Sequence, residues 1–207
     1  MSSGRLLRLS GAALLVGGLL NILPTVISTF LFTGPVWTSV QLLVFIGSLL
    51  ALIGLPGVYL VQARQTGWLG LIGFILIFLA GIILGAGGEI VSGFVLPWLA
   101  TNAPKLAAEQ GPPALIVVFI VINLGGAVGA VLLGLATMRA GVLPRGAGVL
   151  LIVGGVVTVI TAAPFPVAIS TLPSKIGGVI FFLGIAWIGY TLWARKDEAP
   201  QQMAVSL

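Results

Sequence analysis

Residues 81–93 read Gly-Ile-Ile-Leu-Gly-Ala-Gly-Gly-Glu-Ile-Val-Ser-Gly, a run of apolar residues and glycines that holds a single carboxylate. On a helix, Gly81, Gly85, Glu89 and Gly93 form one ridge, because residues four apart share a face. Glycines on such a ridge let a neighbouring backbone approach closely inside a membrane. A carboxylate is costly in lipid, so we expect Glu89 to face protein or water.

The composition around this stretch is that of a membrane protein. Of the 207 residues, 59% are hydrophobic and only 6% are charged, and the mean hydropathy is +1.26. Such values are typical of chains that lie in lipid, and no polar stretch is long enough to fold as a soluble domain. We therefore predict that residues 1–207 form a single integral membrane domain that is all-α.

The chain has no cysteine and no histidine, which removes disulfides, thiolate metal sites and the usual ligands of haem and zinc. We expect no cofactor and no metal. The net charge of +5 does not indicate nucleic acid as a partner, because the cations lie at the ends of apolar segments and form no basic run.

Six apolar segments follow one another, and the first two are divided by the turn-forming cluster Thr33-Gly34-Pro35. The sequence therefore predicts a polytopic six-helix transmembrane bundle. A short helix on the membrane surface is expected near residues 104–110, and a disordered tail at residues 197–207. The predicted membrane helices are about 10–32, 36–61, 68–98, 114–137, 147–163 and 176–193.

Charge sets the expected orientation. With six spans, seven cations fall on one side of the membrane and two on the other, so the positive-inside rule places both termini in the cytoplasm. The seven are Arg5, Arg8, Arg64, Arg139, Arg145, Arg195 and Lys196, and the two are Lys105 and Lys175.

The sequence also contains an internal similarity. Residues 9–20 are similar to residues 145–157, and spans two, four and six end in similar segments at 57–64, 134–139 and 189–195. This pattern predicts three tandem helical hairpins in a parallel repeat, unlike the inverted repeats of many secondary transporters. The alternative is that glycine-rich apolar helices resemble one another by chance.

Six polar residues fall at comparable heights in the predicted helices, from the midplane toward the outer surface. If the helices enclose a common centre, these residues line an outward-opening cleft that is a candidate ligand site. Amides and hydroxyls in membrane helices also serve as ordinary interhelical hydrogen-bonding groups, which is the alternative role. The six are Glu89, Asn123, Asn21, Gln41, Thr158 and Thr161.

Asn123 begins a small-residue face of its own, which continues through Gly126 and Gly134. We expect this face to pack on the Glu89 ridge, with Asn123 hydrogen-bonded to Glu89 and with a leucine at Gly85 forcing the two helices apart. Membrane lipids are expected partners. We further expect that other membrane subunits could bind to the glycine ridges of this chain. These ridges are marked by Gly81, Gly85, Gly126 and Gly134.

Several short stretches carry a resemblance to a group of proteins. Gly54-Leu-Pro-Gly-Val-Tyr59, Phe94-Val-Leu-Pro-Trp-Leu-Ala100 and Arg139-Ala-Gly-Val-Leu-Pro-Arg145 are similar to segments of uncharacterised bacterial six-span membrane proteins of the domain-of-unknown-function type. The resemblance implies a multi-pass protein of the bacterial inner membrane. It implies no activity and no role for any one residue.

Two function classes follow from the sequence. The first is a non-catalytic membrane protein that binds a lipid-like or hydrophobic ligand, or that serves as an accessory subunit of a larger complex. The second is a small proton- or cation-coupled transporter or channel that uses Glu89 in an outward-facing cleft. An enzyme is not expected, because Glu89 has no titratable partner among the residues in the membrane.

Overall fold

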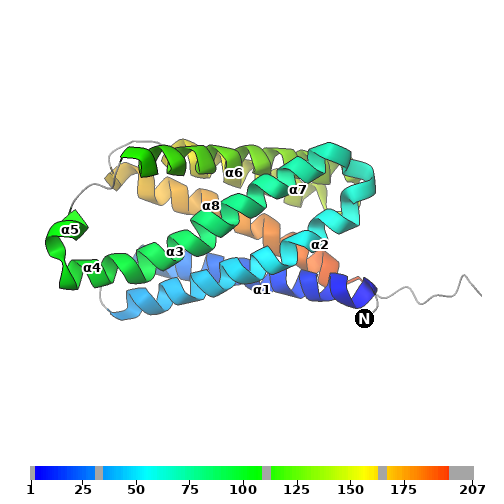
Figure 1. Cartoon of the computed structure of the whole chain (residues 1–207). Helices are drawn as coiled ribbons and strands as arrows, with labels where there is room; N and C mark the ends of the chain where they lie inside the picture. Colours follow the sequence, from blue (N-terminus) through cyan, green and yellow to red (C-terminus); the bar gives the residue numbers. More distant parts are fainter. Residues whose placement is uncertain (1–2, 31–34, 109–112, 163–166, 196–207) are drawn as a thin grey trace, which may run out of the picture.

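The computed structural model describes residues 3–30, 35–108, 113–162 and 167–195, and within these ranges every element is helical (Figure 1). The prediction of an all-α chain is therefore confirmed. The elements are α1 (Ser3–Phe30), α2 (Pro35–Ala80), η1 (Gly81–Gly87), α3 (Gly88–Ile90), η2 (Val91–Val95), α4 (Leu96–Asn102), α5 (Pro104–Ala108), α6 (Pro113–Ala140), α7 (Arg145–Ala162) and α8 (Val167–Trp193), where η denotes π-helix.

Helix α2 consists of two helices that meet at Gly67. Gly67 has φ 51° and ψ −139°, a conformation that is favourable only for glycine. No atom lies within 4 Å of a Cβ placed there, so the backbone conformation and not packing requires the glycine. At this point the chain turns back across the bundle, as the cyan and teal part of Figure 1 shows.

Beyond Gly67 the chain forms one continuous helical rod to Asn102, which crosses the bundle diagonally in Figure 1. Every residue that joins α2, η1, α3, η2 and α4 keeps right-handed helical dihedrals, and the rod ends at Ala103, where φ is −145° and ψ is 63°. The sequence predicted this helix over residues 68–98. It did not predict that residues 81–87 and 91–95 would be π-helical.

The helices pack as a ring in which each contacts its neighbours: α1 lies against α2 and α8, α7 against α8 and α6, and α6 against α2. Glycines make these contacts close. A Cβ on Gly17 of α1 would lie 2.7 Å from the backbone of Gly47 in α2. The fully buried apolar side chains inside the ring include Leu14, Leu133, Leu151, Ile188 and Leu192.

Four helices of the described chain are long and apolar enough to cross a membrane: Gly4–Ile27, Thr38–Asn102, Val117–Ala140 and Leu172–Trp193. The second of these contains the turn at Gly67, and Arg145–Ile160 is a shorter apolar helix. Large apolar side chains cover the outer surface, as at Ile53 and Leu60, which are both 67% exposed. A surface of this kind needs lipid around it, so the chain is a membrane protein.

The predicted boundaries differ from the observed ones most clearly at α8. The sequence predicted that the last helix begins near residue 176, whereas α8 begins at Val167 and contains Pro173. Membrane helices tolerate proline, because neighbouring groups satisfy the freed carbonyl. The short helix expected at residues 104–110 corresponds to α5, and the tail expected at 197–207 lies outside the described residues.

Candidate functional site

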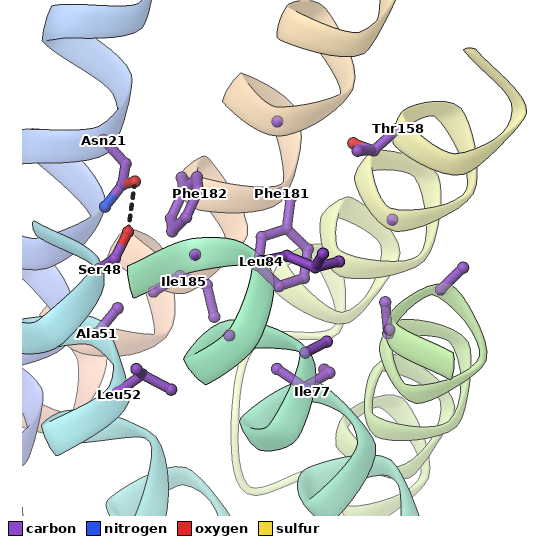
Figure 2. Close-up of a pocket in the computed structure, with 18 of the residues that line it drawn as sticks. Asn21, Ser48, Ala51, Leu52, Ile77, Leu84, Thr158, Phe181, Phe182 and Ile185 are labelled. Atoms are coloured by element: carbon purple, nitrogen blue, oxygen red, sulfur yellow. Dashed lines mark hydrogen bonds between the residues drawn. The ribbon is translucent and has the colours of Figure 1, made fainter. Parts of the chain in front are cut away.

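A cavity of about 310 Å³ lies inside the ring, lined by residues of α1, α2, η1, α3, α6, α7 and α8 (Figure 2). Its polar lining residues include four of the six that the sequence predicted for a common cleft, namely Asn21, Glu89, Asn123 and Thr158. Most of the wall is apolar and contains the side chains of Leu52, Leu55, Ile77, Leu84, Phe181, Phe182 and Ile185.

Glu89 lies in α3, between the two π-helical segments, and its side chain is half-buried. Its Oε2 atom accepts a hydrogen bond from Gln41 Nε2 at 2.7 Å, and the hydroxyl of Ser92 lies 3.5 Å from the same oxygen. Gln41 Nε2 also donates to Ser92 Oγ at 3.0 Å. Gln41 therefore does not line the cavity itself but holds the carboxylate that does.

Asn21 and Ser48 form a second polar pair on the cavity wall, where α1 meets α2. Ser48 Oγ donates to Asn21 Oδ1 at 3.2 Å, which is the bond drawn in Figure 2. Asn21 Nδ2 donates to the carbonyl of Gly17 at 2.8 Å. Both side chains are at most 5% exposed, so the pair is a fixed part of the wall.

Asn123 and Thr158 line the cavity from α6 and α7. Asn123 Nδ2 donates to the carbonyl of Phe119 at 2.9 Å, and Thr158 Oγ1 donates to the carbonyl of Gly154 at 2.8 Å. The bond predicted between Asn123 and Glu89 is therefore wrong, since Gln41 and Ser92 are the partners of Glu89 in the described chain. The side chain of Thr161 lies outside the described residues.

The reason for this different pairing is the direction in which the ridge faces. A Cβ on Gly81 would meet Leu52 at 2.8 Å and one on Gly93 would meet Gln41 at 2.6 Å, so the ridge packs on the first part of α2. The rod contacts α6 through other residues, at Gly73 and Gly129.

The glycines that were expected to receive other subunits face helices of the same chain. Gly126 lies against Ala80, Gly134 against Gly148, and Gly81 against Leu52. Gly85 differs from these, because a Cβ there would meet only Ser48 at 3.7 Å, and Gly85 lines the cavity. A leucine at Gly85 would extend into open space, which corrects the expectation that it would force two helices apart.

Sequence reasoning missed several residues that the structure makes prominent. Ser48 lies seven residues after Gln41, two turns along one face of α2, and this spacing is a signal that could have revealed it. Phe181 and Phe182, which pack edge to face with ring centroids 5.5 Å apart, had no distinguishing pattern. Gln62 and Thr137 are fully buried, and their side-chain polar atoms have no hydrogen-bond partner in the described protein.

The arrangement is suited to binding. The described residues contain no cluster of potential metal ligands, and no lysine or arginine lines the cavity. Among the described residues that line the cavity, Glu89 is the one ionisable side chain. No protein-family model, no curated protein and no solved structure matches the chain.

Proposed function

We propose that this protein is a non-catalytic membrane protein that holds a small hydrophobic or lipid-like molecule inside its helix bundle. The observation that carries the proposal is the cavity of about 310 Å³, which gathers polar residues from separate helices within an apolar wall. Ligand sites in proteins have this character, with mostly hydrophobic lining and a few polar groups that fix orientation.

The volume favours a small ligand. It lies at the lower end of the range for ligand pockets, which is about 300–1,000 Å³. A non-hydrogen atom occupies about the space of a water molecule, roughly 30 Å³, so the cavity accommodates on the order of ten such atoms. The ligand is then a compact molecule, or one chain of a larger lipid.

We also propose six membrane crossings in three hairpins, with both termini in the cytoplasm of a bacterial cell. The turn at Gly67 supports two crossings within residues 35–102, because the rod beyond it is 35 residues long. At 1.5 Å per residue it measures about 50 Å, more than the hydrocarbon core of about 30 Å. The seven-to-two distribution of cations supports the orientation.

The position of Glu89 favours a binding function over a transport function. A proton or cation pathway needs several polar or ionisable groups in series. Among the described residues, the apolar cluster of Leu14, Leu55, Leu133 and Leu151 fills the bundle as its core, and Glu89 is the one ionisable group of the cavity. A role as an accessory subunit gains no support from the predicted glycine ridges, since these face inward.

The test is to fill the cavity and ask what the protein still retains. Gly85→Leu adds a side chain into the open space beside Ser48, whereas Ala100→Leu adds the same side chain at an exposed position of α4. Native mass spectrometry of protein released from nanodiscs should show a small hydrophobic molecule on the wild type and on Ala100→Leu, and not on Gly85→Leu. The same bound species on all three proteins would overturn the proposal.

A further inference from the structure

We propose that the molecule held in this cavity is an amphipathic cation: a compact apolar body that ends in an ammonium group paired with Glu89. The inference rests on the proposed function and names its ligand class. It arises from how the hydrogen-bonding groups of the lining are already used, which leaves acceptors and negative charge for the ligand.

The carboxylate of Glu89 is held on one side and open on the other. Gln41 and Ser92 both approach Oε2, at 2.7 Å and 3.5 Å. No hydrogen bond in the described chain reaches Oε1, and Glu89 lines the cavity. Since Gln41 holds the carboxylate through Oε2, Oε1 is left as an acceptor that a ligand in the cavity can use.

The donors of the site are largely engaged with the protein. Both N–H groups of Gln41 have partners, and the hydroxyl hydrogens of Ser48 and Thr158 go to Asn21 and to a carbonyl of α7. Asn21 and Asn123 each donate one amide N–H to a carbonyl of their own helix and keep a second N–H, and Oδ1 of Asn123 has no partner in the part of the chain that the structure describes. A ligand that enters here meets these two N–H groups beside the acceptors Oε1 of Glu89 and Oδ1 of Asn123, and the acceptors need a donor from the ligand.

The charge of the cavity lining also favours a cationic ligand. The lining contains one carboxylate and no lysine or arginine, so an ionised Glu89 has no cation beside it within the described protein. A carboxylate away from water is stabilised by an opposite charge that also donates a hydrogen bond. An ammonium group supplies both, whereas a phosphate or carboxylate head group would repel Glu89 and find few donors.

The remaining lining specifies the rest of the ligand. Phe181, Phe182 and Ile185 of α8 and Leu52 of α2 form an apolar surface beside the polar groups, as Figure 2 shows. A straight alkyl chain of about ten carbons matches the volume available. Decylamine is therefore a suitable probe, with 1-decanol and decanoate as compounds of equal chain length that lack the positive charge.

The experiment measures binding of these three compounds to the protein in phosphatidylcholine nanodiscs by titration calorimetry, with empty nanodiscs subtracted. We expect wild-type protein to bind decylamine at least about tenfold more tightly than 1-decanol, the effect of one hydrogen bond to a charged group, and to bind decanoate least. Glu89→Gln should lower the affinity for decylamine to that for 1-decanol. Ala100→Leu, outside the cavity, should retain the wild-type preference.

The outcomes separate the two proposals. Equal affinities of decylamine and 1-decanol for the wild type would overturn the inference while leaving a hydrophobic site in place. Retention of the decylamine preference in Glu89→Gln would overturn it as well. If none of the three compounds binds above empty nanodiscs, the proposed function fails with it. Should Glu89→Gln not fold, the wild-type ranking of the three compounds decides alone.

Discussion

Alanine at Gly17 is a sharp test of how the bundle is held together. Gly17 is buried in α1, and a Cβ there would lie 2.7 Å from Ala51 N and 2.7 Å from Gly47 O, both backbone atoms of α2. Non-bonded heavy atoms relax at about 3.5 Å, so α1 and α2 would have to separate by about 0.8 Å. Backbone atoms cannot rotate away as a side chain can, and the shift would spread along the contact.

The expected cost follows from two opposing effects. Overpacking a close contact costs about 1–3 kcal/mol, and replacing glycine by alanine within a helix returns about 0.5–1 kcal/mol. We therefore expect Gly17→Ala to lower the free energy of unfolding by about 1–2 kcal/mol. Gly85→Ala is the matched control, because its Cβ would meet only Ser48 at 3.7 Å and only the gain applies.

Reversible unfolding of both variants in mixed micelles, with sodium dodecyl sulfate as denaturant, gives the two free energies. We expect the free energy of unfolding of Gly85→Ala to be equal to or above that of the wild type, and that of Gly17→Ala to be below it. If Gly17→Ala is as stable as Gly85→Ala, then the close approach of α1 and α2 at this glycine does not hold the helices in place. The assignment of the ring would then need revision at this contact.

Two further predictions concern the turn at Gly67 and the crossings on either side of it. Gly67→Ala should lower the free energy of unfolding by about 1–3 kcal/mol, the cost of a strained backbone conformation. Gly178→Ala is the control and should leave the free energy of unfolding unchanged, because Gly178 has open space at its Cβ and no positive φ. Equal melting temperatures of the two variants in detergent would contradict the strain at Gly67. Thr101 lies at an exposed position near the far end of the rod, and Gln65 is exposed just before the turn at Gly67 from which the rod begins. Because the wild type has no cysteine, an impermeant thiol reagent should label Thr101→Cys from outside the cell and Gln65→Cys only after permeabilisation, and labelling of both from outside would exclude a crossing between them.

The sequence was a good guide to which polar residues share the cavity and a poor guide to which of them form hydrogen bonds with one another. Asn21, Glu89, Asn123 and Thr158 share a cavity because their heights in successive helices are similar, and height follows from counting residues along a helix. The partner of Glu89 depends instead on how the rod is rotated about its axis. The four-residue ridge persists, since Gly81, Gly85 and Gly93 all face the first part of α2, but the spacing does not say which neighbouring helix a ridge faces.

Apolar parts of the site could not be predicted for a different reason. Phe181 and Phe182 are two of 10 phenylalanines in a chain that is apolar throughout, so nothing in their spacing separates a cavity wall from a lipid-facing surface. The inward or outward direction of such a side chain depends on the tilt and rotation of α8 against α1 and α7. Only the packed ring decides these angles.

The π-helical segments also determine where the chain tolerates a change in length. Their hydrogen bonds close from residue i to i+5, so a π-helical turn contains about one residue more than an α-helical turn. Loss of one residue within Gly81–Gly87 can be absorbed by rewinding to α-helix, which leaves Glu89 turned toward Gln41. The same loss a few residues earlier, in the α-helical part of the rod, would rotate everything beyond it by about 100°. Between the turn at Gly67 and Glu89, a deletion that keeps the carboxylate toward Gln41 is therefore confined to Gly81–Gly87.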